Sequence, residues 1–264
     1  MVKHSFRKVF FIIFLAITFS TICHSQIVET TKSNYLHFEL EGALVSPLKI
    51  QPEDSYLKSG VAVGGNFAIG YSKQLNNRIG IDIGGGFGVA PFSINYNINI
   101  TESSPLYPNH KSVDLKYSDY WYKYFMLYVL FEYEFYQKSN SSFGISTGIN
   151  CNFFSESTNT FEDGYQMDGS QSYTFFEYYL DNIDGNIQPA LKLRVFASRY
   201  LKFDKITFGI TANIALLPVA EGTYTFYGLE EEDYSGTLKH WNNYIGFSIR
   251  YCLNLQKKAL KQLE

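Results

Sequence analysis

Residues 68–88 read AIGYSKQLNNRIGIDIGGGFG, two alternating runs joined by the polar triplet NNR. From position 79 the odd positions carry three isoleucines, a glycine and a phenylalanine, while the even positions carry four glycines and Asp82. A dinucleotide- or phosphate-binding loop would need G-x-G-x-x-G or a following G-K-[ST], with a helix after it, and neither pattern is present. The period of two instead predicts a β-hairpin with one large apolar face and one small face.

The same alternation recurs along the chain and predicts eight strands, which are 35–45, 61–75, 79–96, 120–136, 143–154, 187–201, 206–219 and 239–255. Each is long enough for a tilted strand to cross a bilayer, which takes about 9–11 residues. Short connections alternate with long ones, the long ones being 46–60, 97–119, 155–186 and 220–238. This predicts an all-β fold, an eight-stranded antiparallel up-and-down transmembrane β-barrel with short periplasmic turns and long extracellular loops.

Alternation alone leaves a secreted, lipocalin-like carrier open, because a soluble barrel would place its apolar face inside. A face exposed to water would be rich in Lys and Glu, whereas the small face here is dominated by Gly, Ala, Ser and Asn. Small side chains suit the crowded lumen of an eight-stranded barrel. Aromatic residues also gather at both strand ends, with Trp121 and Trp241 near the long loops and Tyr71 and Tyr133 near the short turns. Two aromatic girdles are typical of barrels that span the outer membrane.

The first 25 residues predict a signal peptide, with Lys3, Arg7 and Lys8 before an apolar core and cleavage after Ser25. Residues 26–255 then form the outer-membrane β-barrel domain, and 256–264 a short polar periplasmic tail. Of 22 basic and 25 acidic residues, the signal peptide removes three basic ones, so the mature net charge is −6. This balance gives no indication of nucleic-acid binding.

Over residues 35–255 the chain resembles the small outer-membrane β-barrels of Gram-negative bacteria. The hairpin 68–88 carries this resemblance, together with the strand NYIGFSIRYCLNL at 243–255. The resemblance is to OmpA/OmpX-type barrels and to the PorT-like outer-membrane barrel family. It implies a location in the cell outer membrane, contacts with outer-membrane lipid and lipopolysaccharide, and no catalytic signature.

Charges of both signs lie at positions of lumen parity. They are Glu39, Glu41, Asp82, Glu132, Glu134, Lys192, Arg194 and Arg250. Closing the barrel would pair the last strand with the first and bring Arg250 near Glu39 and Glu41. An isolated buried charge costs several kcal/mol, so these groups should pair, and a structural plug is favoured over an ion gate or proton path.

Two of the long loops are acidic and aromatic. Candidate binding residues there are Asp181, Asp184, Glu230, Glu231, Glu232, Asp233, Tyr178, Tyr179 and Tyr227. They indicate either a solvated, self-repelling rim or a docking surface for a cationic protein or divalent ions bridging to lipopolysaccharide.

The sequence predicts no catalytic residues, no metal ligands and no cofactor. The three mature histidines are far apart and lack ligand spacing, and His240 alone lies at the outer rim, with inward parity. The function expected is therefore a non-enzymatic barrel that is envelope-structural or binds at the surface. The alternative from another class is an outer-membrane enzyme, lipid A-modifying or protease-like.

Overall fold

The computed structural model describes residues 33–53, 56–99, 112–138, 140–155, 158–167, 171–182, 187–201, 204–227 and 233–255. The signal peptide 1–25 and the tail 256–264 lie outside the described residues and remain predictions. Within the described residues, no helix is long and apolar enough to cross a membrane.

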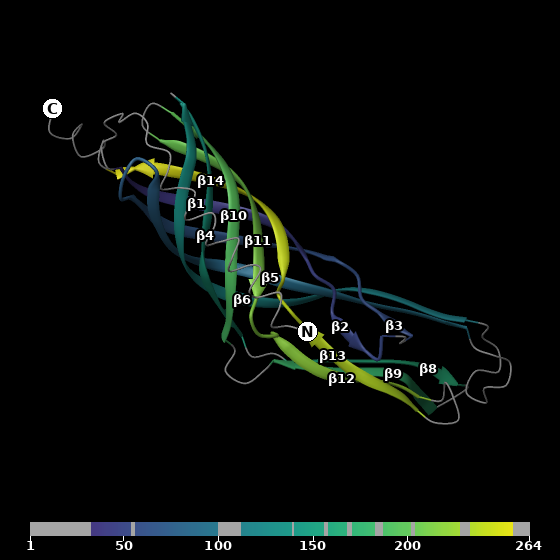
Figure 1. Ribbon diagram of the computed structural model, residues 1–264. Helices are drawn as coiled ribbons and strands as arrows, with labels where there is room; N and C mark the ends of the chain where they lie inside the picture. The colour runs from purple at the N-terminus through teal and green to yellow at the C-terminus, as the bar shows by residue number, and fades with distance from the viewer. Residues whose placement is uncertain are drawn as a thin grey trace. The chain divides into compact units, whose positions relative to one another are not determined.

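Eight antiparallel strands form a closed barrel, which confirms the predicted fold (Figure 1). They are β1 (Asn34–Val45), β4 (Ala62–Gln74), β5 (Ile79–Asn99), β6 (Ser112–Lys138), β7 (Ser141–Phe154), β10 (Ile187–Tyr200), β11 (Lys205–Ala215) and β14 (Tyr244–Asn254). Each pairs with its neighbour along this series, and β14 pairs with β1 to complete the ring. A closed barrel satisfies the backbone polar groups of every strand without leaving an edge.

The β4–β5 hairpin forms as its sequence predicts. Its register places Gly70 opposite Gly84, and the side chain of Asn76 accepts hydrogen bonds from the backbone N–H groups of Arg78 and Ile79 at 2.8 and 2.7 Å. An asparagine bonded in this way stabilises a tight turn. The large side chains point outward, with Phe87 67% exposed, while Asp82 on the opposite parity is fully buried in the lumen.

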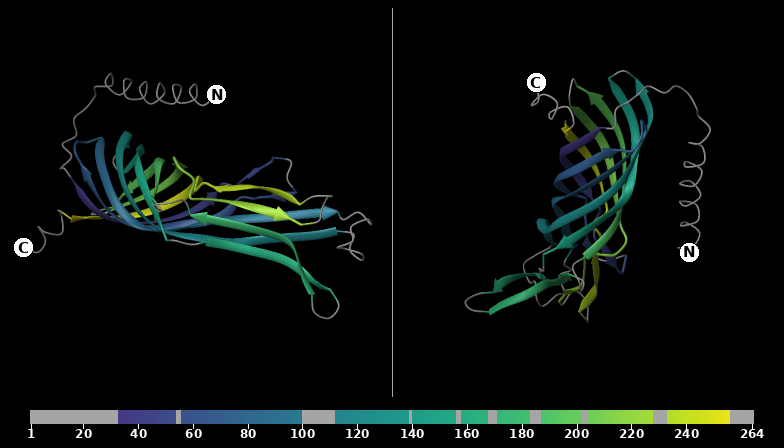
Figure 2. Two further views of the ribbon diagram at one scale, coloured as in Figure 1. Left: turned by 90° about the horizontal axis from the view of Figure 1, so that it is seen from below. Right: turned by 90° about the vertical axis from the view of Figure 1, so that its left-hand side faces the viewer.

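The predicted long connections between barrel strands are present, but much of their length is not irregular loop and forms a second, five-stranded sheet. Its strands, in spatial order, are β2 (Lys49–Gln51), β13 (Tyr234–His240), β12 (Ala220–Phe226), β9 (Gln171–Asn182) and β8 (Thr158–Met167). A short strand, β3 (Leu57–Lys58), pairs with β5. The strands β5 and β6 continue together past the barrel to the pair Asn99 and Ser112, as Figure 2 shows.

The predicted strand 239–255 is divided in two, since β13 ends at His240 and β14 begins at Tyr244. Asparagines hold the chain at this break. The Asn213 amide donates to the backbone carbonyl of Asn242 at 2.8 Å, and the Asn243 side chain accepts from the backbone N–H of Ala215 at 2.7 Å. These bonds replace strand pairing and let the chain pass from the outer sheet into the barrel.

Aromatic packing joins the outer sheet to the extension of β5. The ring of Tyr96 lies 5.0 Å from Phe176 and 5.3 Å from Phe226, measured between centroids. All three side chains are buried in one hydrophobic cluster. Aromatic pairs at such distances stabilise beyond the area that they bury. The outer sheet is therefore a packed part of the barrel's end.

Candidate functional site

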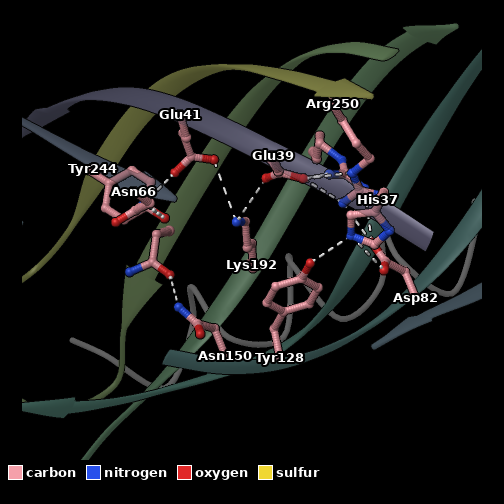
Figure 3. A network of polar contacts seen from close by, with 12 residues as sticks. His37, Glu39, Glu41, Asn66, Asp82, Tyr128, Asn150, Lys192, Tyr244 and Arg250 are labelled. Atoms are coloured by element: carbon pink, nitrogen blue, oxygen red, sulfur yellow. Dashed lines mark hydrogen bonds and ion pairs between the residues drawn. The ribbon is translucent and has the colours of Figure 1, made fainter. Parts of the chain in front are cut away.

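Two arginines and three carboxylates meet inside the barrel, and Figure 3 shows Arg250, Glu39 and Asp82 of this group. Arg250 on β14 lies 2.6 Å from Glu39, 2.6 Å from Asp82 and 3.0 Å from Glu132. Arg194 on β10 lies 2.8 Å from Glu39 and 2.7 Å from Glu132. All five are buried, and they come from five strands, so one cluster ties opposite walls of the barrel together.

Lys192 extends this cluster toward the outer end of the lumen. Its ammonium lies 3.6 Å from Glu39 and 3.5 Å from Glu41. The other oxygen of Glu41 accepts a hydrogen bond of 2.7 Å from Asn66, which in turn contacts Tyr244 at 3.0 Å. The expected pair of Arg250 with Glu39 is present, whereas Glu41 faces Ser248 in the register and pairs with Lys192 instead.

Glu134 lies nearer the short turns and is separately partnered. It accepts a hydrogen bond of 2.9 Å from Tyr200 and lies 3.7 Å from the ammonium of Lys205. Sequence reasoning missed Lys205 because the strand was expected to begin at 206, although Lys205 shares the parity of the buried Thr207. All eight charges predicted for the lumen are thus buried within the barrel.

His37 is a second lumen residue that the sequence analysis did not select. Its Nε2 lies 2.9 Å from the hydroxyl of Tyr128 and 3.4 Å from Asp82, while Nδ1 lies 3.2 Å from the hydroxyl of Ser72. The signal was present, because His37 has the same parity as Glu39 on β1. Ligand spacing along the chain does not reveal His37, because its contacts are made across strands.

The glycines of the hairpin make room for these side chains. A Cβ atom on Gly70 would lie 2.6 Å from the ring of His37 and 2.8 Å from the carbonyl oxygen of Ile83. One on Gly84 would collide with the hydroxyl of Tyr128. All three of these contacts would be shorter than the contacts that real Cβ atoms make. The small face of this hairpin is therefore the space in which the polar network lies.

The outer sheet presents an acidic face on the side opposite its aromatic core. We call the following residues the acidic face: Glu162, Glu177, Tyr179, Asp181 and Glu221. They share one face because the register pairs Glu177 with Glu162 and Asp181 with Glu221 across neighbouring strands. Lys239 on β13 lies 2.6 Å from Glu221, so this edge of the face is partly neutralised.

Tyrosines take part in this face through hydrogen bonds to carboxylates. Tyr179 is 47% exposed and donates to Asp181 at 3.1 Å. Tyr227 donates to Glu177, and this bond, with Asp233 and Glu162 nearby, raises the pKa of Tyr227 to about 12. Tyr227 therefore remains a neutral hydrogen-bond donor throughout the physiological range of pH.

The remaining candidate loop residues divide into three groups. Tyr178 is only 3% exposed and belongs to the hydrophobic cluster, so it does not lie on the surface. Asp233 is exposed at the start of the segment that leads into β13. Asp184 and the run Glu230 to Glu232 lie outside the described residues.

His240 is enclosed at the junction of the barrel and the outer sheet. Its ring lies 5.5 Å from Phe92 and 5.7 Å from Tyr122, and burial lowers its pKa to about 4. The inward parity expected of His240 is therefore confirmed. In the part of the chain that the structure describes, no group of three or more His, Cys, Asp and Glu side chains could hold a metal ion.

Comparison with known proteins finds likeness only among solved structures. The chain matches no protein-family model and none of the curated proteins. It is similar to the outer-membrane protein OprG of Pseudomonas aeruginosa, with 10% identity, 83% of this chain and 96% of that chain covered, and a TM-score of 0.44. It is also similar to AlkL, with 11% identity, 89% and 98% covered, and a TM-score of 0.38.

A third similar structure is the outer-membrane protease OmpT of Escherichia coli, with 9% identity, 88% and 99% covered, and a TM-score of 0.37. The similar solved structures named here are thus outer-membrane proteins. At these identities and TM-scores, nothing about a ligand or activity of this chain follows from them. The resemblance to the PorT-like family remains a prediction from the sequence.

Proposed function

We propose that this chain is a non-enzymatic barrel of the outer membrane, with a structural plug in its lumen and a binding surface on its outer sheet. One observation carries the proposal. Every barrel strand turns large apolar side chains outward, with Val63 70% exposed, while carboxylates, arginines and lysines are buried inside. A soluble carrier would require the opposite arrangement, because its outer face must be solvated by water.

The membrane location is tested by fractionation and by gel mobility. The mature chain should sediment with outer membranes, and it should migrate differently in SDS gels before and after boiling because a closed strand ladder resists detergent. Recovery in the soluble fraction without detergent would contradict the location and support the carrier.

The lumen network supports a plug. Arg194 and Arg250 reach Glu39, Asp82 and Glu132 from different walls, so paired side chains occupy the middle of the barrel. An eight-stranded barrel leaves an interior that side chains just fill. Buried groups that are each engaged by a partner of opposite charge offer no free path to a passing ion.

Binding would then occur at the acidic face. Its carboxylates are exposed or half-buried, and Lys239 partly neutralises one of them, Glu221. Such a face attracts a cationic protein segment, and its exposed tyrosine offers amphipathic area of the kind that interfaces bury. The divalent-ion alternative involves the run Glu230 to Asp233, of which Asp233 alone lies in the described part of the chain.

The binding proposal is tested with a fluorescent oligolysine peptide as the cationic probe. Affinity should fall as the salt concentration rises past about 0.15 M, where the Debye length is near 8 Å. Replacing Glu162, Glu177 and Asp181 with their amides should lower affinity at low salt by roughly tenfold or more. The matched control is Asp204→Asn, a carboxylate between β10 and β11, which should leave the affinity unchanged. If Asp204→Asn lowered the affinity for oligolysine as much as the triple amide variant does, the peptide would be bound by general charge and not by the acidic face.

The enzyme alternative needs an accessible base or nucleophile. His240, the rim candidate, is fully buried between aromatic rings, which supports the non-enzymatic proposal. Turnover of envelope lipid or peptide that is lost in His240→Gln, with heat-dependent mobility retained, would contradict it.

A further inference from the structure

An apolar groove of about 1000 Å³ lies against the barrel wall, lined by residues of five adjacent strands, β1, β4, β5, β6 and β7. Its outward-facing lining is largely apolar, with the exposed side chains of Leu40, Val63, Phe67, Phe87, Trp121 and Phe125. The lumen residues Glu41, Asn66 and Tyr124 line it as well, and the Glu41 carboxylate is already engaged by Lys192 and Asn66. Gly65 lies between Val63 and Phe67 on the same row of β4 and contributes no side chain, which leaves the groove open there. The groove is at the upper end of the roughly 300–1,000 Å³ typical of ligand pockets.

One cation, Lys123, lines this apolar groove. It lies on β6 between Trp121 and Phe125, is exposed, and stands opposite Val89 of β5. Its backbone carbonyl accepts a hydrogen bond from Ser155, but its ammonium has no ion pair with any of the described residues. From Phe125 to Phe135 the outward row of β6 carries no charge. Lys123 therefore lies at the long-loop end of the uncharged, outward-facing row of β6, which would face the lipid.

A lysine at that level is placed for a lipid headgroup. Long basic side chains at the end of an apolar span extend their charge to the interface, and tryptophan is enriched at the same level. Anionic headgroups attract such cations over a short range. An ammonium beside a largely apolar groove is complementary to a molecule that joins a phosphate to an apolar chain. A free phosphate ion would leave the apolar groove unfilled.

We propose that this groove holds one phosphorylated membrane lipid, with its phosphate on the ammonium of Lys123 and an acyl chain along the apolar lining. The inference rests on the proposed membrane location, because only a bilayer supplies this occupant to an outward-facing groove. It is independent of the acidic face, which lies on the outer sheet and has the opposite charge. The barrel would thereby carry a specific lipid at a fixed angular position on its surface.

The test uses the full mature chain, refolded in detergent micelles and examined by native mass spectrometry with three probes. The probes are phosphatidic acid, a diacylglycerol with the same acyl chains, and inorganic phosphate. The barrel should retain one phosphatidic acid and neither of the other two. Lys123→Gln should lower the apparent affinity roughly tenfold, the effect of losing one charged hydrogen bond. The matched control is Lys73→Gln, an exposed lysine of the same outward parity at the short-turn end of β4, which should change nothing.

Each other outcome overturns the proposal in a distinguishable way. If Lys123→Gln and Lys73→Gln lose equal affinity for phosphatidic acid, the anionic lipid is attracted by the general positive charge of the surface and not by a site at Lys123. Equal retention of diacylglycerol means apolar contact without phosphate recognition, and retention of inorganic phosphate means an ion site. Heat-dependent gel mobility, measured on the same samples, separates the two proposals. A chain that stays soluble without detergent removes the membrane location as well, whereas a folded, inserted barrel without bound phosphatidic acid removes only this inference.

Discussion

Arg250 is the most connected cation of the lumen, and its removal gives the sharpest test of the network. Its guanidinium lies within 3.0 Å of Glu39, Asp82 and Glu132, and all four residues are at most 8% exposed. In Arg250→Met, three buried carboxylates would face Arg194 as the remaining arginine. Removing one partner from a buried ion pair costs about 3–5 kcal/mol, because the charge left behind is uncompensated.

Urea unfolding of the barrel in lipid vesicles, followed by tryptophan fluorescence, measures this loss. With a slope of about 2 kcal/mol per molar urea, a loss of about 4 kcal/mol lowers the midpoint by roughly 2 M. The matched control is Arg199→Met, an exposed arginine of β10, which should change the free energy of unfolding by about 0.5 kcal/mol or less.

A double variant then separates ion pairing from packing. Neutralising Glu39 together with Arg250, as Glu39→Gln with Arg250→Met, removes one of the stranded carboxylates. The double variant should be less destabilised than the sum of the single variants by at least about 1 kcal/mol. Additive losses, or a loss in Arg250→Met no larger than in Arg199→Met, would refute the reasoning that these groups act as a paired network.

Three further outcomes are expected. Planar-bilayer recordings of the wild-type barrel should show little steady current, and large, stable porin-like steps would contradict a filled lumen. Gly70→Ala should destabilise by about 1–3 kcal/mol, because its Cβ would lie 2.6 Å from the ring of His37, whereas Gly42→Ala, with nothing within 4 Å, should be tolerated. Because folded His240 binds a proton only near pH 4 and an unfolded histidine near 6.5, the outer sheet should lose up to about 3 kcal/mol as the pH falls between these values. Lower hydrogen-exchange protection factors in β12 and β13 at low pH, corrected for the intrinsic exchange rate, would show this loss, and the change should vanish in His240→Gln.

The barrel could be predicted from the sequence because its determinants are local. A period of two specifies which side chains face the lumen, and alternating short and long connections specify antiparallel neighbours. The alternation therefore places Asp82 and Gly84 on the correct face without any knowledge of tertiary contacts. The pairing of Glu39 with Arg250 followed from closure alone, since the first and last strands of a closed barrel must meet.

The outer sheet could not be predicted in the same way, because its pairing is not local. Strand β12 pairs with β9 across a barrel hairpin, and β13 pairs with β2 from the other end of the chain. The sequence analysis places residues 171–182 in the long connection 155–186, whose acidic and aromatic residues indicate a binding surface. The alternation along β9 places Phe176 and Tyr178 in the core and Glu177 and Tyr179 on the opposite face. Tertiary packing determined which interpretation holds.

The lumen network also bears on how the strands find their register. Buried ion pairs are often no more stabilising than apolar side chains of similar volume, so the network need not add net stability. The network does penalise alternative registers of strand pairing. A shift of β14 by one residue would turn Arg250 toward lipid and Ile249 toward the lumen. A lipid-facing arginine costs about 2–4 kcal/mol near the bilayer midplane, and the same shift would leave Glu39 without its partner. A strand of apolar and small residues alone would slip at far lower cost. The charges therefore act chiefly by excluding wrong pairings, and because a stranded buried charge is what costs most, removing both partners should harm the barrel less than the two single removals added together.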